Sequence, residues 1–97
     1  MVIIMVNQVK ASHILVPGIN KAQELLDKIN AGESFAKMAQ KHSTCPSGKK
    51  GGDLGFFGRG QMVREFEQAA FGAQKGTVVG PIKTQFGYHL IKVTDSR

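Results

Sequence analysis

The first regular pattern in the chain is a run of β-forming residues from Val9 to Val16, which Pro17 and Gly18 bring to an end. Successive side chains of a strand point to opposite faces, and here both faces are apolar. One face carries Val9, Ala11, His13 and Leu15, and the other carries Ile14 and Val16. Apolar residues on both faces are typical of a strand inside a sheet. The pattern therefore predicts a central strand over residues 9–16.

Helical spacing follows this strand. Asn20, with Gln23 three residues later, resembles a capping box and predicts the start of a first helix. Gly32 stands where the C-terminal cap of that helix is expected, and Ser34 can cap a second helix that ends near His42–Ser43. The apolar stripes of the two helices are Ala22, Leu25, Leu26 and Ile29, and then Phe35, Met38 and Ala39.

The second half of the chain alternates short apolar runs with glycine-rich turns. Residues Thr44–Gly52 are rich in Pro, Ser, Gly and Lys and are expected to form a loop. The elements expected after it are a strand edge or turn at Leu54–Phe57, a helix at Val63–Phe71 that stops at Gly72, a strand at Thr77–Val79 that ends at Gly80–Pro81, and a last strand at Tyr88–Val93. This order of elements predicts an α+β domain with a small antiparallel sheet.

Length and composition are those of one ordinary globular domain. The 97 residues suffice for one domain but not for two. A hydrophobic content of 41% and a charged content of 21% argue against disorder. We therefore predict a single domain over residues 1–97. Residues 1–6 are expected to be a flexible extension or, if translation starts at Met5, partly an annotation artefact.

The formal net charge of +6 comes from 13 Lys and Arg residues against 7 Asp and Glu residues. This balance permits binding to nucleic acid or to an anionic surface without requiring it. Most of the cations are Lys, and no ladder of exposed aromatic residues for base stacking is evident. Lys37, Lys41, Lys49 and Lys50 could form a patch, either a nucleic-acid surface or a solvated rim that favours acidic clients.

Cys45 is the single cysteine, so no internal disulfide can form, which fits a reducing compartment. The apolar start, Met1–Val6, lacks a basic leader and a small-residue cleavage site, and it is too short to span a membrane. We therefore expect a soluble cytoplasmic protein without membrane contact. A monomer is the default expectation for so compact a domain.

Two histidines, His13 and His89, fall inside predicted strands with apolar neighbours on their own faces. A histidine in this setting is most often a structural core residue. Because these two lie in the first and last strands, their rings could meet if those strands pair. Thr84 and Ser12 are nearby hydroxyls that could join them in a hydrogen-bond network.

Other chemistries are open at this point. Cys45 beside a histidine could be an activated nucleophile, although the sequence supplies no oxyanion hole and no third orienting residue. A metal site made of His13, His89 and Cys45 would lack the short ligand spacing typical of such sites. The apolar residues Met62, Phe66 and Phe86 are either plain core or a pocket for an apolar ring such as proline.

Three ordered stretches of the chain resemble the signatures of the parvulin family of peptidyl-prolyl cis–trans isomerases. Ala11–Val16 matches the first strand, Gly51–Met62 with Phe66-Glu67 and Ala70-Phe71 matches the central signature, and Gly80–Ile91 matches the closing one. Together they cover about residues 9–94, and the resemblance is closest to minimal, single-domain bacterial or archaeal parvulins. It implies an α+β fold with about four antiparallel strands surrounded by three to four helices.

The resemblance also implies a function, which is to accelerate rotation about X–Pro bonds in unfolded or flexible protein clients. The implied mechanism is non-covalent, and it implies neither cofactor nor metal. The implied catalytic residues are His13 and His89 as a pair beneath the site, Thr84 connected to them, and Cys45 facing the substrate peptide bond. The implied proline-binding residues are Leu54, Met62, Phe66 and Phe86, with Phe57 at their border or in the core beneath.

Two departures from the family pattern bear on specificity. Glu65 stands where many members have Pro, which adds a negative charge near the mouth of the pocket. The loop Pro17–Asn20 is short and offers only Lys21 at its end, whereas phosphate-directed members carry a long, basic loop there. We therefore expect no phosphate-directed specificity. The main rival function is a non-catalytic peptide-binding or chaperone module on the same fold, which would be expected to have lost Met62, Phe66 or a histidine.

Overall fold

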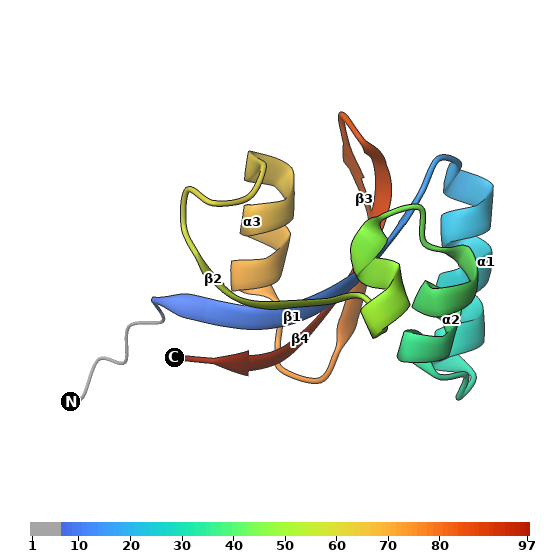
Figure 1. The fold of residues 1–97 in the computed structure, drawn as a ribbon, viewed down its shortest axis with the longest axis horizontal. Helices are drawn as coiled ribbons and strands as arrows, with labels where there is room; N and C mark the ends of the chain where they lie inside the picture. The colour runs from blue at the N-terminus through green and yellow to red at the C-terminus, as the bar shows by residue number, and fades with distance from the viewer. Residues whose placement is uncertain (1–6) are drawn as a thin grey trace.

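A computed structural model describes residues 7–97, so the expectations for residues 1–6 lie outside the described residues. The elements along the chain are β1 (Gln8–Val16), α1 (Ile19–Asn30), α2 (Phe35–His42), the 3-10 helix η1 (Pro46–Lys50), β2 (Asp53–Gly58), α3 (Arg64–Gly72), β3 (Val78–Thr84) and β4 (Gly87–Ser96) (Figure 1). The predicted α+β fold, with four antiparallel strands and three α-helices, is confirmed. Within residues 7–97, no helix has the length and apolar character needed to cross a membrane.

The four strands form one antiparallel sheet in the order β2-β1-β4-β3. The first strand of the chain therefore pairs with the last, from Val9 opposite Ser96 to Val16 opposite Tyr88. This pairing places β1 inside the sheet, as its two apolar faces predicted.

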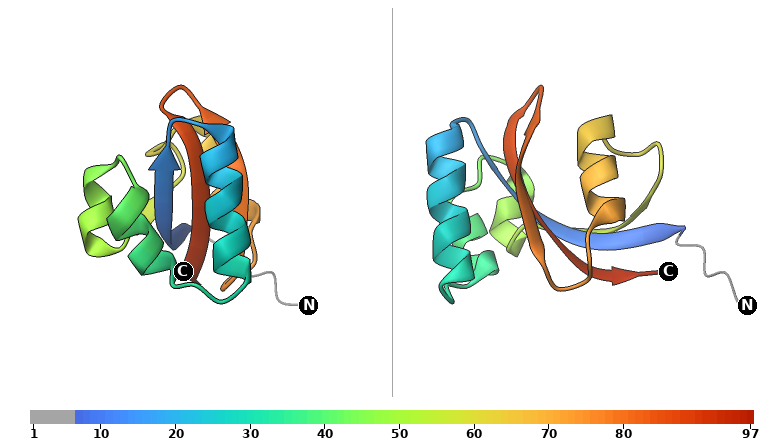
Figure 2. Two further views of the ribbon diagram at one scale, coloured as in Figure 1. Left: turned by 90° about the vertical axis from the view of Figure 1, so that its right-hand side faces the viewer. Right: turned by 180° about the vertical axis from the view of Figure 1, so that it is seen from behind.

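The helices cover the two faces of the sheet at different ends (Figures 1 and 2). On one face α1 and α2 enclose a core that includes Ile14 and Leu90. On the other face α3 packs over a core that includes Ala11 and Ile91. Neighbouring residues of β4 thus enter opposite cores, because side chains alternate along a strand.

The predicted start of α1 was wrong. The helix begins at Ile19 with Gly18 as its N-cap, and Asn20 lies inside the first turn. The turn at Pro17–Gly18 directs the chain into the helix at once, and the Ala22 N–H donates to the Gly18 carbonyl at 3.1 Å. The Gln23 amide donates instead to the Asp27 carboxylate at 3.0 Å.

The expected cap of α2 is confirmed. The backbone N–H of Lys37 donates to the Ser34 hydroxyl at 3.3 Å, and the helix runs from Phe35 to His42.

Strand β3 does not end at Gly80–Pro81 as expected but continues to Thr84. The sheet tolerates the proline because β3 is an edge strand and is irregular between Val79 and Ile82. The short run at Leu54–Phe57 is also a true strand, β2, on the opposite edge. Residues expected to form only a loop contain η1.

Candidate active site

A groove of about 560 Å³ lies over the β1–β4 pair, on the face of the sheet that α3 covers. Its walls come from the segment before η1, from β2, from the turn that leads into α3, and from the β3–β4 hairpin. The residues that line it are His13, Leu15, Thr44, Cys45, Pro46, Leu54, Gln61, Met62, Val63, Phe66, Phe86 and His89. Most of these side chains are apolar, so the groove can receive an apolar ring.

All four residues predicted to bind proline line this groove: Leu54, Met62, Phe66 and Phe86. Phe66 is buried, and its ring meets the rings of His13 and His89 edge-on, with centroids 5.5 and 5.2 Å away. Phe86 is 60% exposed, so it forms a rim open to solvent. Phe57 belongs to the core beneath, at 5.9 Å from the Phe66 ring.

The two predicted histidines meet in the floor of the groove. Strand pairing places Leu15 opposite His89 and His13 opposite Ile91, so the imidazoles are diagonal neighbours on one face. The rings stack with an interplanar angle of 18°, and their Nδ1 atoms lie 3.1 Å apart. Both histidines are buried.

Hydrogen bonds extend the histidine pair in both directions. On one side His89 Nε2 lies 2.8 Å from the Thr84 hydroxyl, which also accepts the Phe86 backbone N–H at 3.1 Å. On the other side His13 Nε2 lies 3.1 Å from the Ser47 hydroxyl, which donates to Cys45 Sγ at 3.3 Å. One chain of hydrogen bonds thus joins the rim at Phe86 to the thiol.

The polarity of this chain follows from the Ser47–Cys45 bond. If Ser47 donates to the thiol, it accepts from His13 Nε2–H, which leaves His13 Nδ1 free to accept from His89 Nδ1–H. His89 Nε2 then accepts from the Thr84 hydroxyl. Each neutral imidazole donates once and accepts once, so the chain is fully satisfied. Among residues 7–97, no buried side-chain nitrogen or oxygen lacks a partner.

The surroundings of the pair favour this neutral state. Burial, and secondly the charge that His89 would carry, lower the pKa of His13 from 6.5 to about 4. Burial also lowers the pKa of His89. Both rings are therefore neutral near pH 7, since the charged form of each would lose hydration without gaining a carboxylate partner.

Cys45 lines the groove and is half-buried. Ser47 stands between its sulfur and His13, so the thiol lacks the direct histidine contact that activates a nucleophilic cysteine. The structure therefore gives no support to a Cys–His hydrolase. Within the described part of the chain, no three His, Cys, Asp or Glu side chains are grouped so that they could hold a metal ion.

Ser47 is the main residue that sequence reasoning missed. It follows Cys45 by two positions in a segment that looked like a plain loop, and no periodic pattern marks it. Ser12 was considered as a hydroxyl that could join the histidines, but that residue adjoins His13 in β1 and points to the opposite face. The close approach of η1 and β2 to β1 brings Ser47 in, because the His13 N–H donates to the Gly52 carbonyl at 2.9 Å.

A second missed feature is the support of the turn that carries Met62. The Gly58 N–H donates to the Gln61 side chain at 2.8 Å, and the Gly60 N–H donates to the Glu67 carboxylate on α3 at 2.5 Å. The same carboxylate lies 3.8 Å from the Arg59 guanidinium. Glu67 thus fixes the turn that forms one wall of the groove.

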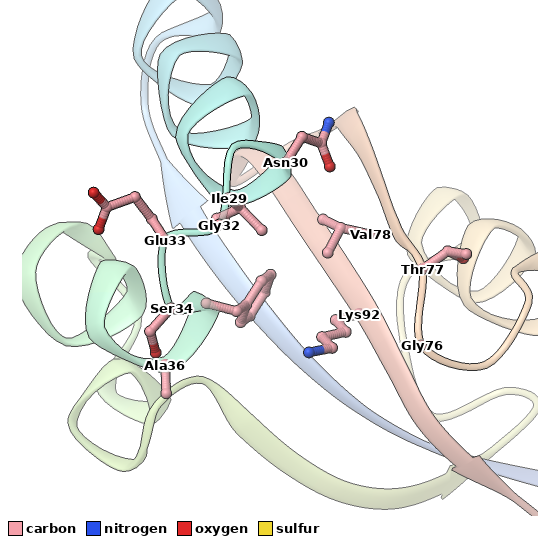
Figure 3. A pocket seen from close by; sticks show the side chains of 11 residues that line it. Ile29, Asn30, Gly32, Glu33, Ser34, Ala36, Gly76, Thr77, Val78 and Lys92 are labelled. Carbon is pink, nitrogen blue, oxygen red and sulfur yellow. The ribbon is translucent and has the colours of Figure 1, made fainter.

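A second cavity, of about 660 Å³, lies between the α1–α2 connection and the strands β3 and β4 (Figure 3). It is more polar, and Lys92 lies on its β4 side. It contains none of the predicted site residues and none of the network described above.

Sequence and structure comparisons agree on the family. A family model described as "Rotamase: PPIC-type PPIASE domain" matches residues 6–95. The foldase protein PrsA of a Geobacillus species is 52% identical over 89 residues, which are 91% of this chain but 32% of that protein. The chain thus spans about a third of the length of the curated foldases that it matches.

Two solved structures give the same result. The peptidylprolyl isomerase PrsA from Bacillus anthracis is similar with a TM-score of 0.93 and 42% identity, over 95% of this chain and 43% of that one. NmPin, the parvulin of Nitrosopumilus maritimus, is 47% identical with a TM-score of 0.83, over 91% of this chain and 96% of that one. The histidine pair, the apolar groove and these relatives lead to one conclusion: the chain belongs to the PpiC-type peptidyl-prolyl cis–trans isomerases, the parvulin family.

Proposed function

We propose that this domain accelerates rotation about X–Pro bonds in unfolded or flexible segments, and that it does so without a covalent intermediate. The proline ring sits in the groove against Met62 and Phe66, while the carbonyl of the preceding residue turns past Cys45. The observation that carries this proposal is an apolar groove whose polar floor is neutral and fully hydrogen-bonded.

Such a groove is suited to amide rotation. The barrier is about 18–20 kcal/mol because the planar amide is stabilised by resonance. The twisted transition state loses that resonance and is less polar, so an environment of low polarity favours it over the planar state. Lowering the barrier by roughly 4 kcal/mol gives about a thousandfold acceleration. No bond needs to be broken, so no nucleophile is required.

We further propose that recognition does not depend on phosphate. The one cation near the end of the short β1–α1 turn is Lys21, whose ammonium lies 3.2 Å from the Glu24 carboxylate. A single, already paired lysine is a poor site for a phosphate dianion, which is usually held by several cations or by a bidentate Arg.

The clients we propose are proline-containing segments of unfolded proteins, in line with the foldase names of the relatives.

We also propose a monomer in a reducing compartment such as the cytoplasm, where the free thiol of Cys45 would persist. Light scattering at micromolar concentration tests the first point, and a dimer would overturn it. Locating the native protein in cell fractions tests the second, and recovery outside the cytoplasm would overturn it.

The experiment that tests the proposed function is NMR exchange spectroscopy on an Ala-Phe-Pro-Phe peptide, with and without the protein. Faster cis–trans exchange that is lost in Met62→Ala is the expected result. Met38→Ala is the matched control, because Met38 is buried in the core on the other face of the sheet. Peptide binding without acceleration would mean that the groove belongs to a binding module and not to an enzyme.

A further inference from the structure

Four exposed lysines lie on α2 and at the end of η1, two elements that contact each other. We define the lysine surface as Lys37, Lys41, Lys49 and Lys50. The first two are four residues apart on α2 and so lie on one side of that helix, and the other two end η1. All four are exposed, and none takes part in an ion pair found among residues 7–97.

The two helices are in direct contact at a point next to two of these lysines. A Cβ added at Gly51 would lie 2.9 Å from the Cβ of Ala36. Lys50 and Lys37 are the chain neighbours of these two residues. The backbone at Lys50 therefore lies close to the backbone at Lys37.

The electrostatic surroundings of His42 agree with a positive surface. After burial, the charges of Lys21, Lys28 and Lys41 lower the pKa of this histidine, and only Glu24 acts against them. The Glu24 carboxylate lies 3.2 Å from the Lys21 ammonium and 3.5 Å from the Lys28 ammonium. Lys41 is the member of the lysine surface that contributes to this effect.

This surface adjoins the groove. Thr44, Cys45 and Pro46 line the groove, and Pro46 is also the first residue of η1. With a rise of about 2 Å per residue in a 3-10 helix, the backbone of Lys49 and Lys50 lies roughly 6–8 Å from Pro46. An extended peptide covers about 3.4 Å per residue. A residue two to four positions from a bound proline therefore comes within reach of these ammonium groups.

The composition of the patch favours a carboxylate-rich polypeptide as its partner. It contains no Arg, the residue best suited to bidentate contacts with phosphate. The exposed large apolar residues of the described chain are Ile19 and Phe86, so the patch has no aromatic platform on which bases could stack. Flexible lysines suit a mobile acidic chain, because their attraction needs no fixed geometry.

We propose that the lysine surface selects acidic client segments, so that prolines with Asp or Glu two to four residues away are isomerised preferentially. This inference rests on the proposed function, since it names the substrate class of the same groove. The surface raises the occupancy of the groove and does not touch the rotating bond. Its effect is therefore on KM and falls with ionic strength.

The test compares two peptides, Asp-Asp-Ala-Phe-Pro-Phe-Asp-Asp and the same sequence with Asn in place of every Asp. Exchange rates give kcat/KM for each at low and at 0.5 M salt. We expect the acidic peptide to be preferred by roughly threefold to tenfold at low salt, as for a few exposed ion pairs, and by less than about twofold at high salt.

Three double variants, each removing two charges, complete the test. K49Q/K50Q and K37Q/K41Q should each reduce the preference by at least about half, and both should keep the wild-type rate on the Asn peptide. K75Q/K92Q, which removes two lysines that belong neither to the groove nor to the lysine surface, should keep the full preference.

Equal kcat/KM for the two peptides, or a preference that all variants retain, overturns the inference. Binding to DNA or to anionic vesicles that these variants lose, with no preference between the peptides, also overturns it and assigns the surface to phosphate groups. If neither peptide is isomerised, the proposed function fails instead, so the two failures are distinguishable.

Discussion

Lowering the pH from 8 to 5 should destabilise the domain through the buried histidine pair. The pKa of His13 is lowered from 6.5 to about 4 in the folded chain by burial and by His89. Between pH 6.5 and about pH 4, His13 is protonated in the unfolded chain and neutral in the folded chain. The free energy of unfolding is therefore highest above about pH 7 and falls as the pH drops through 6.5 toward 4.

The size of the effect follows from the shift. A difference of 2.5 pKa units corresponds to about 3 kcal/mol once the pH has fallen below 4. At pH 5, His13 alone accounts for a loss of about 2 kcal/mol, and the lowered pKa of His89 acts with the same sign. This loss is a large fraction of the stability of a small domain, about 5–15 kcal/mol. The window from pH 8 to 5 lies above the range in which most carboxylates titrate.

The assay is urea unfolding at constant ionic strength across this window. His42→Gln serves as the control, because the pKa of His42 is also lowered but its ring lies outside the network. The slope should persist in this control and largely disappear in His13→Gln/His89→Gln. If the double variant does not fold, NMR titration of the two rings replaces it: His13 should stay neutral to about pH 5, and the pKa of His89 should lie below 6.5. A flat stability profile, or rings that titrate near 6.5, would refute the reasoning.

Substitutions at three residues test other parts of the site. Phe66→Ala should cost about 3–5 kcal/mol of unfolding free energy in urea and abolish peptide binding, because a ring that contacts both histidines is lost; a loss below 1 kcal/mol would contradict this packing. Thr84→Val should cost about 1–3 kcal/mol, since it leaves His89 Nε2 and the Phe86 N–H unpaired, whereas Thr84→Ser should restore stability and the ¹⁵N signature of the His89 tautomer. Glu67→Ala should raise KM about fivefold with little change in kcat by freeing the turn that holds Met62, and Glu67→Gln, which still accepts from the Gly60 N–H, should stay near wild type; equal kinetics of the two variants would remove the positioning role.

The local sequence pattern correctly predicted the elements whose conformation does not depend on tertiary contacts. The two apolar faces of β1 identified it as a central strand, and Ser34 marked the start of α2. The errors lie where neighbours in space decide the conformation. In a sequence, a proline predicts the end of a strand. In the structure Pro81 lies within β3, because β3 is at the edge of the sheet. The helix start depended on the turn at Gly18 and not on the polar side chain at Asn20.

The same distinction holds for the site. The contact between His13 and His89 could be predicted from the sequence, because the fold that the motifs imply pairs the two strands that carry them. Ser47 could not be found, because its contact with His13 depends on how η1 packs across β1. Glu67 was hidden for a similar reason: its carboxylate acts on the backbone of a turn seven residues away. Side-chain-to-backbone contacts of this kind leave no periodic signal in a sequence.

The most direct test of non-covalent isomerisation in this groove is the exchange rate of the Ala-Phe-Pro-Phe peptide with Cys45→Ser. Serine keeps a polar group beside Ser47 but is a far weaker nucleophile than a thiolate. Our account predicts that the variant retains at least roughly a tenth of the wild-type kcat/KM, a change of about 1.4 kcal/mol or less in the barrier. Complete loss of acceleration in a variant with an intact fold would contradict it.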